Sequence, residues 1–251
     1  MAHLLFYQSV VPLNADYHRQ WCLAPPTDYR FAAGTNSVPV TLGEMVDVAR
    51  EMPLVFAPVG GGDFLLAALL GLRQDENLFV AADGAWTARY VPAFIRRYPF
   101  ILSHNDRGEH VVCFDDTAVA TIHRGPPGAA LFDPTGAPAP ALQACLQLLD
   151  AYRLQAEATA AWVRRIVALD LLEPVAADAR LKDGGHFVLD GLYVISRARF
   201  QGLAPDQIQA LFAADALAGI YAHFFSIASF NPLVDRLGTR RSGHCALQQE
   251  P

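Results

Sequence analysis

The fold is decided by residues 139–169, APALQACLQLLDAYRLQAEATAAWVRRIVAL. Apolar side chains recur along this stretch at helical spacing, at Leu142, Leu146, Leu149, Tyr152, Ala156, Ala160, Val163 and Val167. The spacing predicts one long helix with one apolar face. Because a helix gains most of its stability by packing such a face, we expect a sheet to cover it. The sequence therefore predicts a single domain over residues 1–237, followed by a flexible tail over 238–251.

The other predicted elements differ in type between the two halves of the chain. Apolar runs bounded by turn residues predict strands at 54–57, 65–72, 78–80, 100–103 and 110–114, and a second hairpin over 181–196 around residues 182–185. Capping and proline signals predict helices at 41–50, 92–97 and from 205 to about 237. Strands dominate the first half and helices the second. This favours an α+β fold, in which a mainly antiparallel sheet from the N-terminal half packs against C-terminal helices.

Composition excludes several classes of function. The 251 residues carry a formal net charge of -6, which argues against a general nucleic-acid binder, since phosphate neutralisation needs a basic face. No run of 18 or more uncharged apolar residues occurs, so we expect no transmembrane segment. The first residues lack the basic region of a secretory signal, so we expect a cytoplasmic protein.

Lysine and cysteine chemistry are poorly represented. Lys182 is the only lysine and lies at a predicted turn, so neither a Schiff-base site nor a P-loop is indicated. The four cysteines are widely spaced and form no Cys-x-x-Cys motif, which argues against a zinc or redox site built on that motif.

Several segments carry a family resemblance. They are PLVFA at 53–57, AALLGL at 67–72, ENLFV at 76–80, DGAW at 83–86, YVPAFIRRYPF at 90–100, LFDPTG at 131–136, GLYVI at 191–195, and YAH at 221–223 with Ser226. Together they resemble the bacterial SapC family over roughly residues 5–237. The segment at 90–100 is the most specific of them.

The resemblance implies an accessory role more than a catalytic one. The family takes its name from bacterial surface layers, and no established catalytic mechanism comes with it. Similar proteins are found in gene neighbourhoods that hold tryptophan-halogenase-like and cupin-like proteins and outer-membrane receptors. This implies support for substrate uptake or for modification by partner proteins. A structural role at the surface layer is the other role that the resemblance implies.

The densest group of candidate binding residues lies between residues 86 and 98. It contains Trp86, Tyr90, Phe94, Arg96, Arg97 and Tyr98. A guanidinium can clamp a carboxylate or phosphate, and an aromatic ring can stack on a planar ligand. The alternative is that the rings belong to the core and that the arginines pair with carboxylates of the chain.

Three further groups contain titratable side chains. His18 and Glu44 could act as a base and its orienter, although Glu44 also fits the capping box at residues 41–44. His104-x-Asp106 with His186 matches the spacing of an iron-binding facial triad. His223 and Ser226 lie three residues apart on an apolar helix, where we expect His223 to be a hydrogen-bonded core residue.

The leading hypothesis is a non-catalytic accessory or binding protein that recognises a protein, peptide or small molecule through residues 86–98, His18 and Glu44. It assigns no metal, and the sequence identifies no cofactor. The alternative is a metal-dependent enzyme, such as an iron and 2-oxoglutarate oxygenase using His104, Asp106 and His186. The sequence leaves open whether any catalysis occurs.

Overall fold

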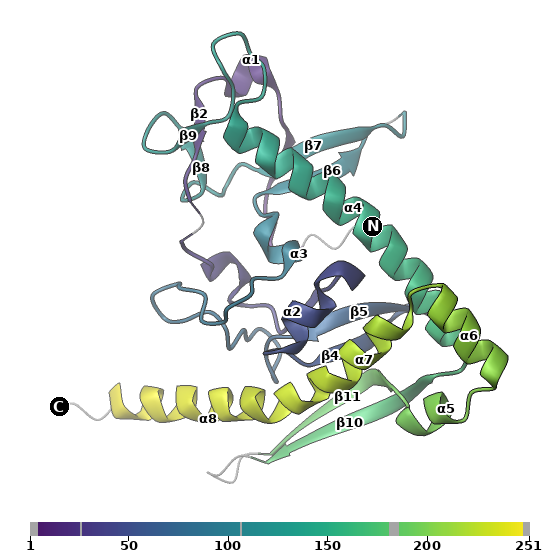
Figure 1. Ribbon diagram of the computed structural model, residues 1–251. Coiled ribbons are helices and arrows are strands. Elements are labelled where there is room, and N and C mark those ends of the chain that lie inside the picture. The colour runs from purple at the N-terminus through teal and green to yellow at the C-terminus, as the bar shows by residue number, and fades with distance from the viewer. Residues whose placement is uncertain (1–4, 26, 106, 181–185, 248–251) are drawn as a thin grey trace. The chain divides into compact units, whose positions relative to one another are not determined.

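The computed structural model describes residues 5–25, 27–105, 107–180 and 186–247 (Figure 1). About 39% of the chain is helix and 24% is strand, and the strand pairings described are antiparallel. The predicted α+β class is confirmed. The chain divides into two compact units, with residues 1–32, 80–86 and 93–154 in unit 1 and the remaining residues in unit 2.

Unit 1 contains two small antiparallel sheets. One has the order β1-β7-β6, formed by Val10–Pro12, His110–Asp115 and Phe100–His104. The other has the order β8-β2-β9, formed by Ile122–Arg124, Trp21–Leu23 and Ala129–Ala130. Its helical elements are α1 (Ala15–His18), η1 (Arg30–Ala32), α3 (Ala93–Arg96) and residues 140–154 of α4 (Pro140–Ala168). Its core includes Phe100, Phe114, Ile122, Leu131, Leu142 and Leu149.

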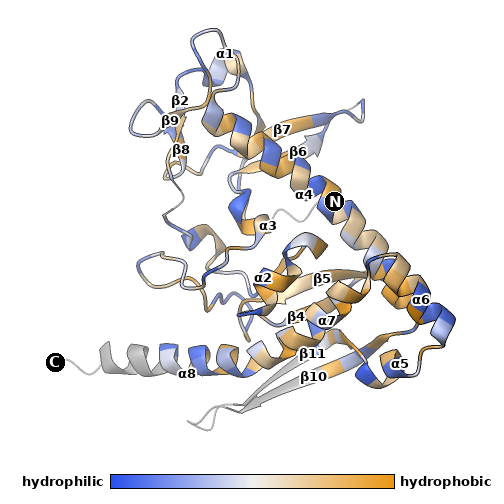
Figure 2. Ribbon diagram, viewed as in Figure 1, coloured by the Kyte–Doolittle hydropathy of each residue, from blue (hydrophilic) through white to orange (hydrophobic). Residues whose placement is uncertain are grey.

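Unit 2 is built on a five-stranded sheet. The strand order is β10-β11-β4-β5-β3, formed by Leu172–Arg180, His186–Ile195, Leu54–Gly60, Asp63–Leu69 and Ser37–Pro39. Its helical elements are η2 (Leu42–Glu44), α2 (Met45–Ala49), α5 (Arg197–Gln201), α6 (Pro205–Ala213), α7 (Leu217–Ser226), η3 (Ile227–Ser229), α8 (Phe230–Leu247) and residues 155–168 of α4. Helix α7 contacts α2, β4 and β11. Figure 2 shows that α7 carries many apolar residues.

Local signals in the sequence place several of these elements. The long helix is α4, and the strands predicted at 100–103 and 110–114 pair as the hairpin β6 and β7. The capping box is present, with the Thr41 backbone N–H donating to Glu44 Oε1 at 2.9 Å. Strands predicted at 54–57 and 65–72 pair as β4 and β5. The helix predicted at 92–97 is α3, which begins at Ala93, and the helix predicted from 205 begins at Pro205.

Four features differ from the sequence-based expectation. The second hairpin begins at Leu172, because pairing with β11 makes a strand of an alanine-rich stretch that contains Pro174. Residues 78–80 form an isolated bridge at Val80 instead of a strand. Residues 124–140, rich in glycine and proline and therefore expected to form a linker, contain β9. Helix α8 continues to Leu247, so the boundary predicted at residue 237 falls inside a helix, while the single-domain assignment stays a prediction.

Candidate binding site

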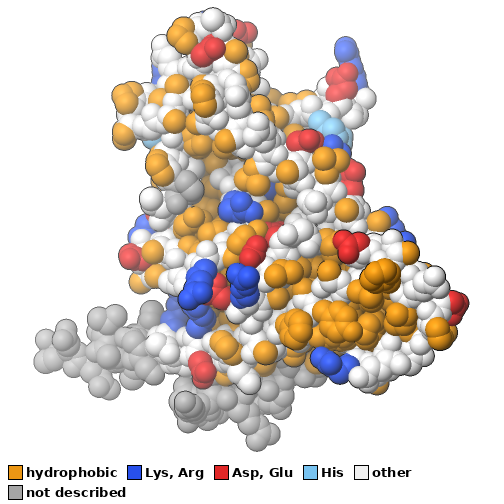
Figure 3. Space-filling model, in the orientation of Figure 1, with side chains coloured by type: hydrophobic (Ala, Val, Ile, Leu, Met, Phe, Trp, Pro, Cys, Tyr) orange, Lys and Arg blue, Asp and Glu red, His pale blue; other side chains and the backbone are white. Residues whose placement is uncertain are grey.

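An apolar trough lies on unit 2 between α2 and α7. It has a volume of about 550 Å³ and is lined by Val46, Ala49, Arg50, Ala218, Tyr221, Ala222, Phe225, Ala228, Ser229 and Pro232. We call it the α2–α7 trough. Figure 3 shows hydrophobic side chains gathered over the region of α7, at the lower right of the view. Large side chains remain open to solvent along the trough, with exposed fractions of 59% for Val46, 47% for Tyr221 and 71% for Phe225.

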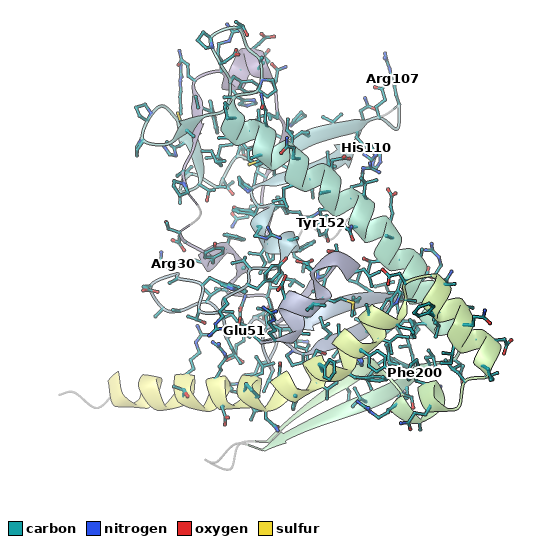
Figure 4. All side chains as sticks on the ribbon, in the orientation of Figure 1. Arg30, Glu51, Arg107, His110, Tyr152 and Phe200 are labelled. Atoms are coloured by element: carbon teal, nitrogen blue, oxygen red, sulfur yellow. The ribbon has the colours of Figure 1, made fainter. Side chains whose placement is uncertain are left out.

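Hydrogen bonds fix both walls of the trough to the body of unit 2. Ser226 Oγ accepts from the Leu54 backbone N–H at 3.0 Å and donates to the His223 carbonyl at 2.7 Å, which ties the end of α7 to β4. Ser229 Oγ donates to the Ala49 carbonyl of α2 at 3.0 Å. Phe200 packs edge-on against Tyr221 from α5, as the label in Figure 4 helps to locate. The exposed rings therefore stand on a preorganised scaffold.

One end of the trough contains Arg50 and adjoins a polar pocket. Arg50 also lines an adjoining pocket of about 370 Å³, together with Asp47, Glu51, Arg89 and Tyr90. Arg50 approaches Asp47 at 3.5 Å, and Glu51 accepts a hydrogen bond from the Arg89 backbone N–H at 2.8 Å. Among the described residues, no ion pair joins the exposed Arg89 guanidinium to a carboxylate. This end of the trough therefore adjoins both guanidinium and carboxylate groups.

The opposite end of the trough contains a carboxylate and an amide. A hollow of about 250 Å³ shares Val46, Ala218 and Ala222 with the trough and extends to Asp215 and Gln155. Both of these polar residues are exposed. The trough therefore adjoins Asp215 at one end and, at the other, a pocket that carries two carboxylates and two guanidinium groups.

Two of the predicted site residues, Tyr90 and Glu44, contact each other beside the polar pocket. The Tyr90 hydroxyl donates to Glu44 Oε2 at 2.9 Å, while Glu44 Oε1 accepts from Thr41. The Glu44 carboxylate is buried, with 5% of the residue exposed. Glu44 therefore serves as a capping residue and as the anchor that positions Tyr90 in the pocket wall.

Three of the other predicted residues pack within unit 1. Phe94 is 4% exposed, and the Arg97 guanidinium lies 4.1 Å from its ring centroid and 4.8 Å from that of Tyr152. Tyr98 stacks on Phe31 with a centroid distance of 3.9 Å. Burial raises the pKa of Tyr98, as does the nearby carboxylate of Asp115. These contacts fit the alternative interpretation, in which the rings belong to the core.

The remaining predicted binding residues also lie in unit 1. Trp86 lies 5.7 Å from Tyr29 between ring centroids, and Arg96 is exposed on α3. His18 Nδ1 accepts from the Asn14 backbone N–H at 2.9 Å. The group predicted from residues 86–98, His18 and Glu44 is thus divided between the two units. A ligand-binding role for these residues stays a prediction.

The proposed iron triad falls largely outside the described residues. Asp106 and the side chain of His186 belong to the parts that the structure does not describe. The His104 ring lies 4.5 Å from the ring of His110 across the β6–β7 hairpin, and Figure 4 labels His110 on the hairpin and Arg107 at its tip. Within the described part of the chain, no group of three or more His, Cys, Asp or Glu residues is placed to hold a metal ion.

His223 is buried, but it is not hydrogen-bonded as expected. The residue is 0% exposed, and neither ring nitrogen has a hydrogen-bond partner among the described residues. Burial lowers the pKa of His223 to about 4. Its ring packs 5.5 Å from that of Phe56. His223 is therefore a neutral core residue, and Ser226 is held by backbone hydrogen bonds.

Sequence reasoning missed the exposed residues of the trough. The signal available was the composition of α7, LAGIYAHFFS. Its apolar residues are too many to lie only on the buried side of the helix, so some of them face solvent. The wider segment Leu217–Arg240 is long and apolar enough by composition to cross a membrane, with 39% of its most apolar window buried. Core helices share this composition, so it is weak evidence for a membrane segment. The expectation of no transmembrane segment stays a prediction.

Comparison with known proteins identifies the family. The family model described as SapC matches residues 13–233, which is most of the chain. Neither a curated protein nor a solved structure matches the chain. The match includes the Tyr90–Phe100 segment and both walls of the α2–α7 trough. The chain therefore belongs to the SapC family.

Proposed function

We propose that this SapC protein is a non-catalytic accessory protein, which binds a partner through the α2–α7 trough. One observation carries the proposal: Val46, Tyr221 and Phe225 are exposed side by side on walls that hydrogen bonds hold in place. A contiguous apolar patch on a rigid surface is typical of an interaction site, because leaving such area in water is unfavourable. The accessory role implied by the family resemblance supports the same function.

The polar pocket next to Arg50 contains one of the binding residues that were predicted from the sequence. Tyr90 lines the polar pocket there, and Glu44 fixes its hydroxyl. An apolar surface with a few polar groups at its edge gives a partner both affinity and orientation. Tyr90 then forms part of the polar rim of a binding site whose centre is Phe225, and the buried Glu44 holds Tyr90 in place.

Site-specific photo-crosslinking tests this function. A photoreactive phenylalanine replaces Phe225 in the protein expressed in its bacterial host, and a matched control replaces Tyr17, which is 80% exposed in unit 1. We expect illumination to give a discrete adduct from position 225 and none from position 17. Adducts of equal yield from both positions, or none from position 225, would contradict the proposal.

A further inference from the structure

Two histidines face each other at the outer end of the β6–β7 hairpin in unit 1. His104 on β6 is the cross-strand partner of His110 on β7, and their ring centroids lie 4.5 Å apart. Both residues are exposed, and among the described residues neither imidazole forms a hydrogen bond or an ion pair. Imidazole is the commonest metal-binding side chain, so two potential metal ligands lie side by side here.

The hydrogen bonds of the hairpin place this pair where opposing side chains are closest. The Asn105 backbone N–H donates to the Glu109 carbonyl at 3.0 Å, so these two residues form a hydrogen-bonded pair. Because the two kinds of pair alternate along an antiparallel ladder, His104 and His110 form a non-hydrogen-bonded pair. The Cβ atoms of opposing residues are roughly 4.5–5.5 Å apart, closer in non-hydrogen-bonded pairs, and both side chains leave the same face of the sheet.

The face that carries the two histidines begins in the core of unit 1. Its other cross-strand pairs are Phe100 with Phe114 and Leu102 with Val112. The two phenylalanines belong to the core, and Leu102 and Val112 pack against it. Packing of one face fixes the register of a strand pair. The strands that carry the histidines are therefore held in register by packing as well as by hydrogen bonds.

Pairing of the two imidazoles does little for the hairpin itself. When both rings are protonated they repel each other, and like charges directly opposite on neighbouring strands are destabilising. A metal ion binds the neutral form of both rings and replaces the repulsion by two coordinate bonds. The arrangement of His104 and His110 is therefore better suited to a bound cation than to stabilising the strands.

The separation of the rings matches a metal ion held by two imidazoles. A metal about 2.1 Å from an imidazole nitrogen lies roughly 3.2 Å from the ring centroid. Two such rings about 90° apart have centroids roughly 4.5 Å apart, whereas a tetrahedral angle separates them by roughly 5.2 Å. The observed 4.5 Å is thus the separation expected for adjacent positions of a tetragonal complex, a geometry typical of Cu²⁺.

We propose that His104 and His110 form a binding site for Cu²⁺. The two imidazoles occupy adjacent positions on the ion, and water or a ligand from another molecule occupies the others. Cu²⁺ also has the highest affinity for nitrogen ligands among the divalent ions of the first transition row. The site requires neither Asp106 nor His186, and it lies in unit 1, so it does not depend on the function proposed for the α2–α7 trough.

Titration with the Cu²⁺ complex of iminodiacetate tests the site. This tridentate chelator leaves adjacent positions of the ion open, so tight binding requires two imidazoles on one face. All proteins carry His3→Gln, because a histidine near the amino terminus binds Cu²⁺ together with backbone nitrogens. Calorimetry of the full chain should give one complex per chain, and His104→Gln or His110→Gln should each weaken binding at least tenfold.

A relocation variant controls for adventitious binding. Glu109→His combined with His110→Gln keeps two histidines on the hairpin but puts them on opposite faces, because neighbouring residues of a strand alternate. It should bind as weakly as the single variants, and circular dichroism should show all variants folded. Pulsed electron paramagnetic resonance should detect two imidazole nitrogens on Cu²⁺ in the parent and one in His110→Gln.

Two results would overturn the inference. Parent-like affinity in the relocation variant or in either single variant would show an adventitious ion only. Failure of the parent to bind the complex more tightly than His104→Gln does would show that the two rings do not act together.

Discussion

His223 is a buried titratable group whose charged form is disfavoured in the folded protein. Its imidazole lies on α7 beside Phe56, and neither nitrogen is hydrogen-bonded within the described residues. Desolvation disfavours the charged form of such a ring, and this holds its pKa at about 4 in the folded protein. The unfolded chain takes up the proton at a pKa near 6.5.

The first prediction concerns stability in acid. Because the folded pKa of His223 is depressed, its stabilising effect is complete above about pH 6.5 and is lost as the pH falls toward 4. We expect this residue alone to reduce the free energy of unfolding by on the order of 3 kcal/mol over that interval. Urea titrations at pH 7, 5 and 4 measure it. His223→Leu should remove this part of the pH dependence, and exposed His110→Gln should keep it; identical slopes for all three proteins would refute the assignment.

The second prediction concerns Gly71, at a point of close backbone approach. A Cβ added there would overlap the backbone carbonyl oxygen of Glu76, and the Gly71 N–H donates to the Asn36 carbonyl at 3.0 Å. Since backbone cannot yield as a side chain does, Gly71→Ala should destabilise the protein by about 1–3 kcal/mol. The matched control is Gly34→Ala, whose Cβ would have nothing within 4 Å. Thermal unfolding that ranks the two variants equally would argue against the overlap.

At the scale of elements, the carboxylate of Glu44 caps the start of η2 and also holds Tyr90 in the polar pocket beside the trough. Glu44 accepts from Thr41 in the capping box and from the hydroxyl of Tyr90. The residues that follow, in α2, form one wall of the trough. Stability of the helix start and the position of Tyr90 are therefore coupled.

The third prediction follows from that sharing. Glu44→Ala removes both sets of hydrogen bonds, so we expect a loss of about 1–3 kcal/mol in the free energy of unfolding. Tyr90→Phe keeps the capping box and removes one bond, so it should cost about 0.5–1.5 kcal/mol. Chemical denaturation of the two variants and of the double variant completes a mutant cycle. Additive losses would show that the capping box and Tyr90 are not coupled.

At the scale of the whole molecule, α4 belongs to both units. Its 29 residues run without a break from Pro140 to Ala168, and the division between the units falls between Leu154 and Gln155. A continuous helix shared in this way favours cooperative unfolding, as the predicted single domain requires.

The fourth prediction tests that cooperativity. Leu154 is 51% exposed, so Leu154→Ala should change stability little, whereas Leu154→Pro should cost about 3 kcal/mol by interrupting the helix. Calorimetry should show one transition for the parent and the alanine variant, and two for the proline variant. Two transitions already present in the parent would show that the single-domain prediction is wrong.

The sequence by itself determined the elements whose signals are local. The apolar repeat of α4, the capping box at Thr41 and the turns between apolar runs each depend on neighbours within a few residues, so their positions and the α+β class could be predicted. The SapC family was likewise identified from contiguous segments such as Tyr90–Phe100.

Only the tertiary structure decided which residues share a surface. Strand β10 exists because β11 supplies its hydrogen bonds, and its own alanines and proline give little strand preference. Phe94 and Phe225 are equally apolar, yet one is 4% and the other 71% exposed, because burial depends on what packs against each ring. The α2–α7 trough joins residues that are far apart in the chain, such as Ala49 and Phe225, and the local sequence pattern does not predict that contact.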